Sequence, residues 1–394
     1  MEKPKGSSNL VHPSLPSLFL SFLRLGLTAF GGPAMVAYMR TMAVERKRWL
    51  DEETFRDGVA LCQTIPGATS MQTTAYVGLK ARGIAGAVLG FTGFVFPAFC
   101  GVTILSALYV HTHNLPVVVS AFGGLRAIIV SIIANAAISF GKSNLKGFKD
   151  IVITAIAGIL FGLGTNPALV ILLAALLGML FYRRESFQGS GSCSGTTAPY
   201  PKTYLASLIA ALTGYILLFC ISRPFFQLAT LMSKVDLLAF GGGYTSVPLM
   251  FHEVVNVYKW IDARIFMDGI VLGQVTPGPI VITATFVGYW LYGLSGSIIG
   301  TISVFLPSFL IVVGIVPYYD RVRGSAWFHR TMRGILSSFV GLLLSVTIHF
   351  GMNVQWNLFL ILIAAAALVA LLRRVEIIWV VLAGVILSII ALHR

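Results

Sequence analysis

Apolar segments of membrane length recur along the chain, separated by short polar or basic stretches. In the first half they lie at about 15–39, 58–79, 84–110, 117–140, 150–165 and 167–183. In the second half they lie at about 204–222, 225–249, 268–291, 295–318, 332–350, 355–372 and 375–392. A transmembrane helix needs about 20 mostly apolar residues. The pattern therefore predicts an all-α integral membrane protein.

Four of these segments depart from a plain apolar helix. Segments 15–39 and 225–249 are interrupted by glycine clusters, whereas 58–79 and 268–291 are rich in polar residues and divided by Pro-Gly. Such breaks fit either full spans with broken helices or re-entrant hairpins. The charge pattern favours hairpins, because they would place the five basic residues of 40–57 on the inner side of the membrane.

The two halves are copies of one unit. Phe30-Gly31-Gly32-Pro33 returns 210 positions later as Phe240-Gly241-Gly242-Gly243. At an offset of 211, nine residues recur, namely Trp49, Asp51, Phe55, Asp57, Gly58, Leu61, Gln63, Pro66 and Gly67. Gly78, Gly83, Gly86, Gly90, Pro97 and Phe99 recur at an offset of 210. Chance would not align so many unlike residues with so few gaps.

The repeat defines the expected organisation. Residues 1–183 form the N-terminal membrane repeat, 184–202 a flexible linker, 203–223 an additional transmembrane helix and 224–394 the C-terminal repeat. The additional helix gives an odd number of crossings, so the second repeat is expected to be inverted. Loop charge agrees, since Lys80–Arg82 is basic and its counterpart Tyr292–Gly293 is not. Inverted-topology repeats are typical of secondary transporters.

Composition narrows the functional classes. The chain is 57% hydrophobic and 11% charged, with a net charge of +14 that lies mostly in loops, as in a multi-pass plasma-membrane protein. The positive charge therefore predicts no nucleic-acid partner; the partner is the lipid bilayer. The four cysteines and seven histidines form no metal-binding or redox motif. We therefore expect no metal, no cofactor and no enzymatic activity.

The glycine clusters are candidates for an anion site. A broken helix exposes backbone N–H groups that bind anions. One cation lies at the same offset before each cluster and adds positive charge. The predicted residues are Arg24, Gly31, Gly32 and Pro33, and Lys234, Gly241, Gly242 and Gly243. Close helix packing and snorkelling of Arg24 to the interface are the alternative interpretations.

The Pro-Gly segments add neutral donors. Their predicted binding residues are Gln63, Pro66 and Gly67, and Gln274, Pro277 and Gly278. Interhelical hydrogen bonding is the alternative role for these glutamines. Asp57 and Asp268 precede these segments as helix N-caps or as coupling carboxylates, and the N-cap interpretation is favoured. Arg126 and Arg333 open helices and are interpreted as interface anchors.

The combination F-G-G-P at 30–33, F-G-G-G at 240–243, Q-T-I-P-G at 63–67 and Q-V-T-P-G-P at 274–279 resembles the chromate ion transporter (CHR) family, in its long two-domain form. The resemblance implies chromate efflux and chromate resistance, with sulfate as a related substrate. Chromate and sulfate are tetrahedral dianions of similar size, so geometry discriminates them poorly. A homodimer is one option for a transporter, although the sequence identifies no interface. The alternatives are a sulfate or other oxyanion importer, a membrane enzyme and a passive channel.

Overall fold

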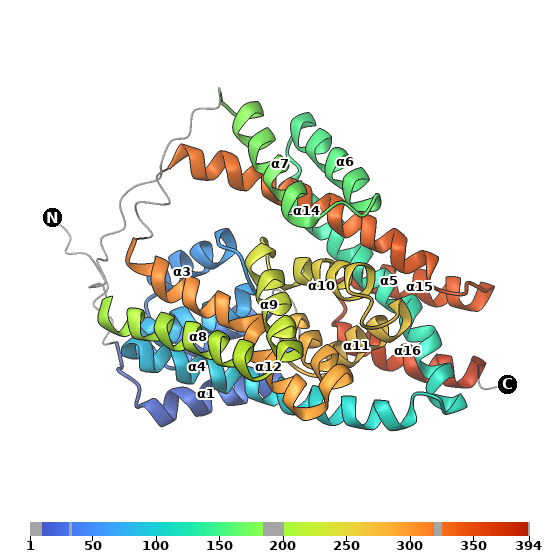
Figure 1. The fold of residues 1–394 in the computed structure, drawn as a ribbon, viewed down its shortest axis with the longest axis horizontal. Coiled ribbons are helices and arrows are strands. Elements are labelled where there is room, and N and C mark those ends of the chain that lie inside the picture. Colours follow the sequence, from blue (N-terminus) through green and yellow to red (C-terminus); the bar gives the residue numbers. More distant parts are fainter. Residues whose placement is uncertain (1–9, 31–33, 184–200, 319–324, 393–394) are drawn as a thin grey trace.

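The structure is a computed structural model that describes residues 10–30, 34–183, 201–318 and 325–392 (Figure 1). Within these ranges the secondary structure is helical, apart from one isolated parallel bridge between Phe30 and Gly278. The predicted all-α class is confirmed for the described residues. Gly31, Gly32 and Pro33 lie outside them, as does most of the predicted linker.

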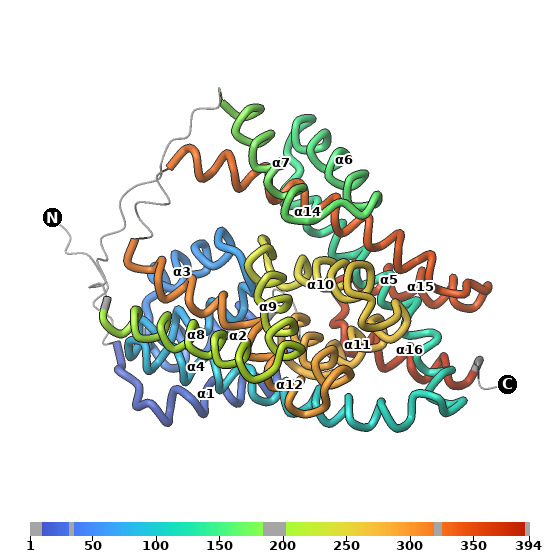
Figure 2. Tube along the Cα trace, in the orientation of Figure 1, coloured from blue at the N-terminus to red at the C-terminus, as the bar shows by residue number. Residues whose placement is uncertain are grey.

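The described part of the first repeat contains seven α-helices and one π-helical turn. They are α1 (Leu15–Thr28), α2 (Ala34–Arg40), η1 (Thr41–Arg46), α3 (Glu52–Thr64), α4 (Thr69–Thr112), α5 (Pro116–Asn144), α6 (Phe148–Gly162) and α7 (Pro167–Phe181). Helix α8 (Pro201–Ile221) follows. It packs against α9 (Arg223–Leu238) and α12 (Thr283–Ile315) of the second repeat (Figure 2).

The second repeat reproduces this order and adds two short 3₁₀ turns, η3 and η4. It comprises α9 (Arg223–Leu238), α10 (Gly243–Phe251), η2 (His252–Val257), α11 (Ala263–Val275), η3 (Ile280–Ile282), α12 (Thr283–Ile315), η4 (Val316–Tyr318), α14 (Ala326–Met352), α15 (Leu358–Leu372) and α16 (Ile377–Leu392). Even the π-helical turns η1 and η2 recur, 211 positions apart.

Local sequence explains where α3 and α11 begin. Asp51 caps α3 by accepting a hydrogen bond from Thr54 N at 2.7 Å, and Glu52 and Glu53 in the first turn suit the positive end of the helix. Asp262 is at the corresponding N-cap position of α11. The interpretation of Asp57 and Asp268 as N-caps is therefore wrong, because both lie inside their helices.

Helices α4 and α12 are each folded back in the middle. Arg82 and Gly83 leave the helical conformation in α4, and Gly83 takes a φ of +65°. A Cβ placed on Gly78 would lie 2.2 Å from Gly86 O. Residues eight apart in a straight helix are about 12 Å apart, so the two arms approach face to face. Tyr292 and Gly293 make the same fold in α12.

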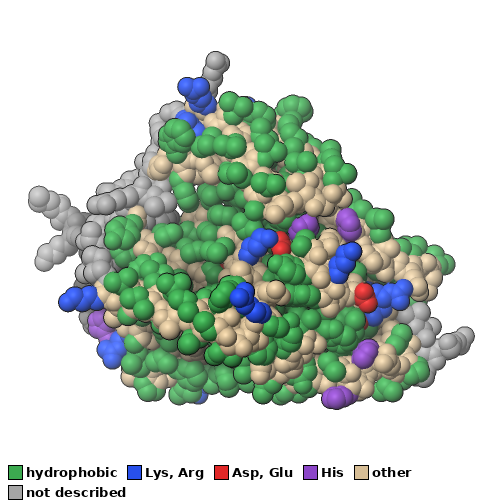
Figure 3. All heavy atoms as spheres, viewed as in Figure 1, with side chains coloured by type: hydrophobic (Ala, Val, Ile, Leu, Met, Phe, Trp, Pro, Cys, Tyr) green, Lys and Arg blue, Asp and Glu red, His purple; other side chains and the backbone are tan. Residues whose placement is uncertain are grey.

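Several helices are long and apolar enough to cross a membrane. Within the described residues these are α4, α5, α8, α12 with its flanking 3₁₀ turns, and α14. The face shown in Figure 3 is mostly hydrophobic, with isolated charged side chains. Such a surface suits contact with lipid rather than water.

The two repeats exchange their C-terminal helices. Helix α5 of the first repeat packs against α15 and α16 of the second, and α14 of the second packs against α6 and α7 of the first (Figure 1). Helices α4 and α12 also pack against each other. The core is therefore built from both repeats together.

Candidate functional site

The four helix breaks meet in pairs, each pair formed by both repeats. Gly67 N donates to Ala239 O at 2.6 Å, and Gly278 N donates to Ala29 O at 3.0 Å. Ala29 and Ala239 are the C-caps of α1 and α9. Each Pro-Gly break of one repeat is thus hydrogen-bonded to the residue that caps the first helix of the other repeat.

Glycine is required at both Pro-Gly breaks. Gly67 has a φ of +119° and Gly278 a φ of +130°, which L side chains rarely adopt. A Cβ on Gly67 would lie 1.9 Å from Ser308 Oγ, and one on Gly278 would lie 2.6 Å from Ala98 Cβ. Ser308 and Ala98 are repeat equivalents, so the two close approaches are related by the same pseudo-symmetry.

The second glycine cluster also has left-handed backbone. Gly241 and Gly242 have φ values of +85° and +104°, and Gly242 is the N-cap of α10. A Cβ on Gly242 would lie 3.4 Å from Thr69 Oγ1, at the start of α4. The beginnings of α4 and α10 therefore lie close to each other.

Buried amides lie near these breaks. Gln72, in the first turn of α4, donates from Nε2 to Pro66 O at 2.5 Å and is fully buried. Gln274, three residues before Pro277, is 6% exposed, and its Nε2 has no hydrogen-bond partner among the described residues. Gln63, its repeat equivalent, has an exposed side chain. A buried donor without a partner is costly, which distinguishes Gln274 from Gln63.

The two predicted cations lie in different environments. Arg24 is exposed on α1, as the snorkelling interpretation expects. Lys234 Nζ is 2.6 Å from Glu253 Oε1, and the Glu253 side chain is 6% exposed. The charge of Lys234 is therefore compensated by a buried carboxylate on η2.

Among the described residues, two ion pairs connect the repeats. Arg126 on α5 donates to both oxygens of Asp268 on α11, each at 2.7 Å, and Tyr109 OH donates to Asp268 Oδ2 at 2.5 Å. The Asp268 side chain is 1% exposed. Arg126 is therefore the partner of a buried carboxylate rather than an interface anchor.

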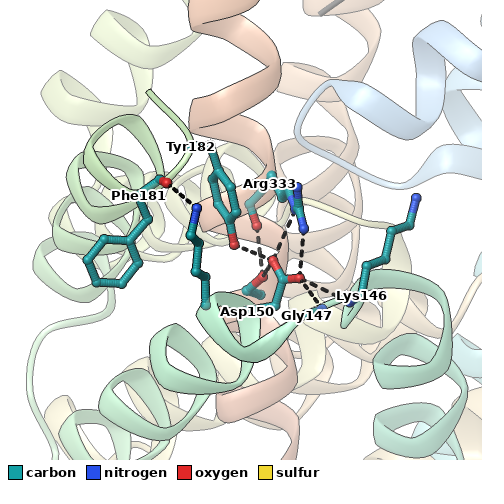
Figure 4. A network of polar contacts seen from close by, with 8 residues as sticks. Lys146, Gly147, Asp150, Phe181, Tyr182 and Arg333 are labelled. Atoms are coloured by element: carbon teal, nitrogen blue, oxygen red, sulfur yellow. Dashed lines mark hydrogen bonds and ion pairs between the residues drawn. The ribbon is translucent and has the colours of Figure 1, made fainter. Parts of the chain in front are cut away.

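The other ion pair places Arg333, the repeat counterpart of Arg126 at an offset of 207, beside Asp150 of the first repeat (Figure 4). Arg333 on α14 donates to both oxygens of Asp150 on α6, at 3.1 and 3.0 Å, and its guanidinium lies 4.1 Å from the ring centroid of Tyr182. The Tyr182 hydroxyl donates to the same carboxylate, as do the backbone N–H groups of Lys146 and Gly147. The interface-anchor interpretation is wrong for Arg333 also.

Sequence reasoning missed three buried carboxylates, Asp150, Glu253 and Asp236, of which Asp236 contacts no cation among the described residues. Asp236 on α9 is fully buried and accepts hydrogen bonds from Ser308 N at 2.7 Å and Ser308 Oγ at 2.9 Å. Its counterpart 210 positions earlier is Gly26, so Asp236 is not among the residues that the two repeats share. An acid inside the apolar segment 225–249 was the available signal.

The fold and the paired breaks define a multi-pass membrane protein built from two interlocked repeats. The chain belongs to the chromate transporter family: the family's model matches residues 16–179 and, a second time, residues 226–389. As a member of a transporter family it has a non-enzymatic role, and it is a multi-pass protein of the cytoplasmic membrane.

Three relatives illustrate the range of similarity. An uncharacterized transporter of Methanocaldococcus jannaschii is 44% identical over 382 residues, which cover 96% of this chain and 94% of that protein. A chromate transport protein of Cupriavidus metallidurans is 31% identical, over 78% of this chain and 75% of that protein. A chromate transport protein of Pseudomonas aeruginosa is 30% identical, over 85% of this chain and 80% of that protein. No solved structure matches the chain.

Proposed function

We propose that this protein is a secondary active transporter that exports chromate across the cytoplasmic membrane by alternating access. The reciprocal hydrogen bonding of the two pairs of helix breaks, Gly67 with Ala239 and Gly278 with Ala29, is the observation that carries the proposal. Binding sites at discontinuous helices between structural repeats are a general design of such transporters. The family membership supports an oxyanion as the substrate.

The proposed anion site lies where these breaks meet. Its donors are the backbone N–H groups at the starts of α4 and α10 and the buried amide of Gln274, whose Nε2 lacks a partner among the described residues. Helix N-termini favour anions because their N–H groups and dipoles point at the ligand. Arg24 and Gln63 have exposed side chains, so the proposed site does not use them to contact the anion.

The proposal includes inverted repeats with re-entrant segments. Helices α1 and α3 have 14 and 13 residues, so each is about 20 Å long at 1.5 Å per residue. That is shorter than the hydrocarbon core of about 30 Å. Helix α8, which has no counterpart in the first repeat, supplies the odd crossing that inverts the second.

Electrostatics favours export. An inside-negative potential moves anions outward, with about 2.3 kcal/mol per charge per 100 mV. A chromate dianion that leaves without a compensating ion is therefore driven out by the resting potential. The lower charge of a monoanion would halve this driving force.

The test is radiolabelled chromate flux into inverted membrane vesicles under an imposed interior-positive potential, compared with vesicles lacking the protein. We expect potential-driven accumulation that excess sulfate inhibits. Accumulation equal to that of vesicles without the protein would contradict chromate export. Uptake of labelled sulfate into right-side-out vesicles would then favour the alternative, a sulfate or other oxyanion importer. The predicted homodimer stays a prediction, testable by light scattering of the purified protein.

A further inference from the structure

Asp236 differs from the other buried acids of the protein. It lies two residues before the end of α9, close to Gly241 and Gly242, and its side chain is fully buried. The carboxylates of Asp268, Asp150 and Glu253 each contact an arginine or lysine. Within the described ranges, the donors to Asp236 are the backbone N–H and the hydroxyl of Ser308, with the backbone N–H of Ala68 as a further donor, and none of them is a cation.

The charged neighbours of Asp236 are few. Helices α10 and α12, which pack against α9, contain no Asp, Glu, Lys, Arg or His. Helix α8 contributes the hydroxyl of Tyr215, which is hydrogen-bonded to Ser233, whereas its lysine, Lys202, is exposed at the start of the helix. The nearest cation in sequence, Lys234, is paired with Glu253. No cation from these elements therefore compensates an ionised Asp236.

Asp236 is connected to the helix breaks. Ser308 Oγ, which contacts Asp236, also accepts a hydrogen bond from Ala68 N at 3.1 Å. Ala68 directly follows Pro66-Gly67 and is the N-cap of α4. Proton loss from Asp236 would thus change the hydrogen bonding at the Pro-Gly break of the first repeat, through the Ser308 hydroxyl and the backbone N–H of Ala68.

Pro307 leaves one backbone carbonyl of α12 without its helical hydrogen bond, and a side chain of α9 binds that carbonyl. A proline cannot donate a backbone hydrogen bond, so the carbonyl of Ser303 lacks its usual partner within α12. Ser233 Oγ donates to that carbonyl at 2.7 Å instead. Helix α9 therefore contacts α12 at its proline through Ser233 and Asp236, one turn apart on the same face.

The network occurs in one repeat only. The counterparts of Asp236 and Ser308 are Gly26 and Ala98, neither of which has an ionisable side chain. Gly26 has no space for one, because a Cβ there would lie 2.4 Å from Phe94 O. Between the two repeat-equivalent positions, only Asp236 can therefore carry a proton.

We propose that Asp236 binds and releases a proton in each transport cycle and couples proton entry to anion exit; this rests on the proposed function. An ionised carboxylate buried without a cation is costly, whereas the protonated acid is not. When the site opens outward, one carboxylate oxygen forms an O–H bond with a proton from water. When it opens inward, that bond breaks and water takes the proton, with no electron transferred. Proton entry and dianion exit both move positive charge inward, so the membrane potential drives the two together.

The test uses the purified full-length chain in liposomes with a pH-sensitive dye inside. Two quantities are measured: labelled-chromate exchange across the membrane, and the internal pH change driven by a chromate gradient. Asp236→Asn keeps the size and an acceptor oxygen but cannot titrate. Asp262→Asn is the matched control, the same change at an exposed N-cap position.

We expect wild type and Asp262→Asn to move protons against chromate. Asp236→Asn should lose proton movement to the level of protein-free liposomes while chromate exchange persists and becomes independent of pH. Ser308→Ala keeps the carboxylate but removes one donor to its ionised form, so its exchange should stay coupled with a pH profile displaced to higher pH. This second variant keeps the proposal testable if Asp236→Asn does not fold.

Two results would overturn the proposal. Proton movement by Asp236→Asn at the wild-type rate would show that another group carries the proton. Chromate exchange by wild type without any internal pH change would show that no proton is coupled, while the transport function stands. Absence of chromate exchange by wild type would overturn both the transport function and the coupling that rests on it.

Discussion

At the scale of single residues, the site depends on backbone conformations that only glycine adopts easily. Gly67 and Gly278 hold left-handed φ values and also allow another helix to approach closely. Either requirement alone would disfavour a side chain. Together they explain why the Pro-Gly pair recurs in both halves of the chain.

Gly67→Ala is therefore expected to destabilise the protein. The left-handed backbone costs about 1–3 kcal/mol for a non-glycine residue, and the new methyl group would also collide with Ser308. The thermal unfolding midpoint of the purified protein should fall clearly. Gly214→Ala is the control, since nothing lies within 4 Å of a Cβ on that α8 glycine. Equal midpoints for the two variants would refute the close packing at Gly67.

Which side chains face inward was only partly predictable from sequence. Gln63 and Gln274 are indistinguishable in the repeat pattern, yet one is exposed and the other buried. Arg24 and Lys234 likewise correspond, but only Lys234 has a buried acidic partner. A repeat pattern identifies equivalent backbone positions, whereas burial depends on neighbours that differ between the halves.

At the scale of elements, sequence reasoning placed most of the breaks. Proline and glycine have strong local effects, so α3 and α11 end at the Pro-Gly pairs, and the folds within α4 and α12 fall at the loops predicted around Lys80–Arg82 and Tyr292–Gly293. The start of α3 was misjudged because Asp51 and Asp57 both suit an N-cap. Only the hydrogen bond from Thr54 N to Asp51 decides between them.

The ion pair between α5 and α11 gives an element-scale prediction. Asp268→Asn leaves the half-buried Arg126 without its carboxylate, and breaking a buried pair typically costs about 3–5 kcal/mol. Denaturant unfolding should show a loss of that order. Glu52→Gln removes an exposed partner of Arg40 and should have little effect.

A double variant provides the decisive comparison. Arg126→Leu combined with Asp268→Leu removes both charges, so it should recover part of the stability that Asp268→Asn loses. A double variant less stable than Asp268→Asn would mean that the pair is not the main source of the effect.

At the scale of the whole molecule, the repeats depend on each other. Helix α5 packs against α15 and α16, and α14 packs against α6 and α7. Sequence comparison identified the duplication but not this exchange, because a repeat pattern contains no information on which copy a helix contacts. The pairing of each Pro-Gly break with the residue that caps the first helix of the other repeat was hidden for the same reason.

The exchange predicts that neither half is stable alone. When residues 1–192 and 193–394 are expressed as separate chains in the same membrane, they should co-purify through a tag on either one. Each half expressed alone should accumulate poorly, because the helices that bury its apolar faces are missing. Equal accumulation of the single halves, without co-purification, would contradict the interlocked arrangement.

The central claim is that an oxyanion binds where the breaks of the two repeats meet, with Gln274 as a donor. The most direct measurement is potential-driven chromate flux in inverted vesicles for wild type, Gln274→Leu and Gln227→Leu at matched protein levels. Gln227 is an exposed glutamine on α9. The same substitution at Gln227 therefore shows the effect of replacing a glutamine by leucine outside the proposed site. We predict that Gln274→Leu loses most of the flux, at least tenfold if about 1.4 kcal/mol of binding is removed, whereas Gln227→Leu matches wild type. Wild-type flux by Gln274→Leu would contradict the account and place the anion elsewhere in the protein.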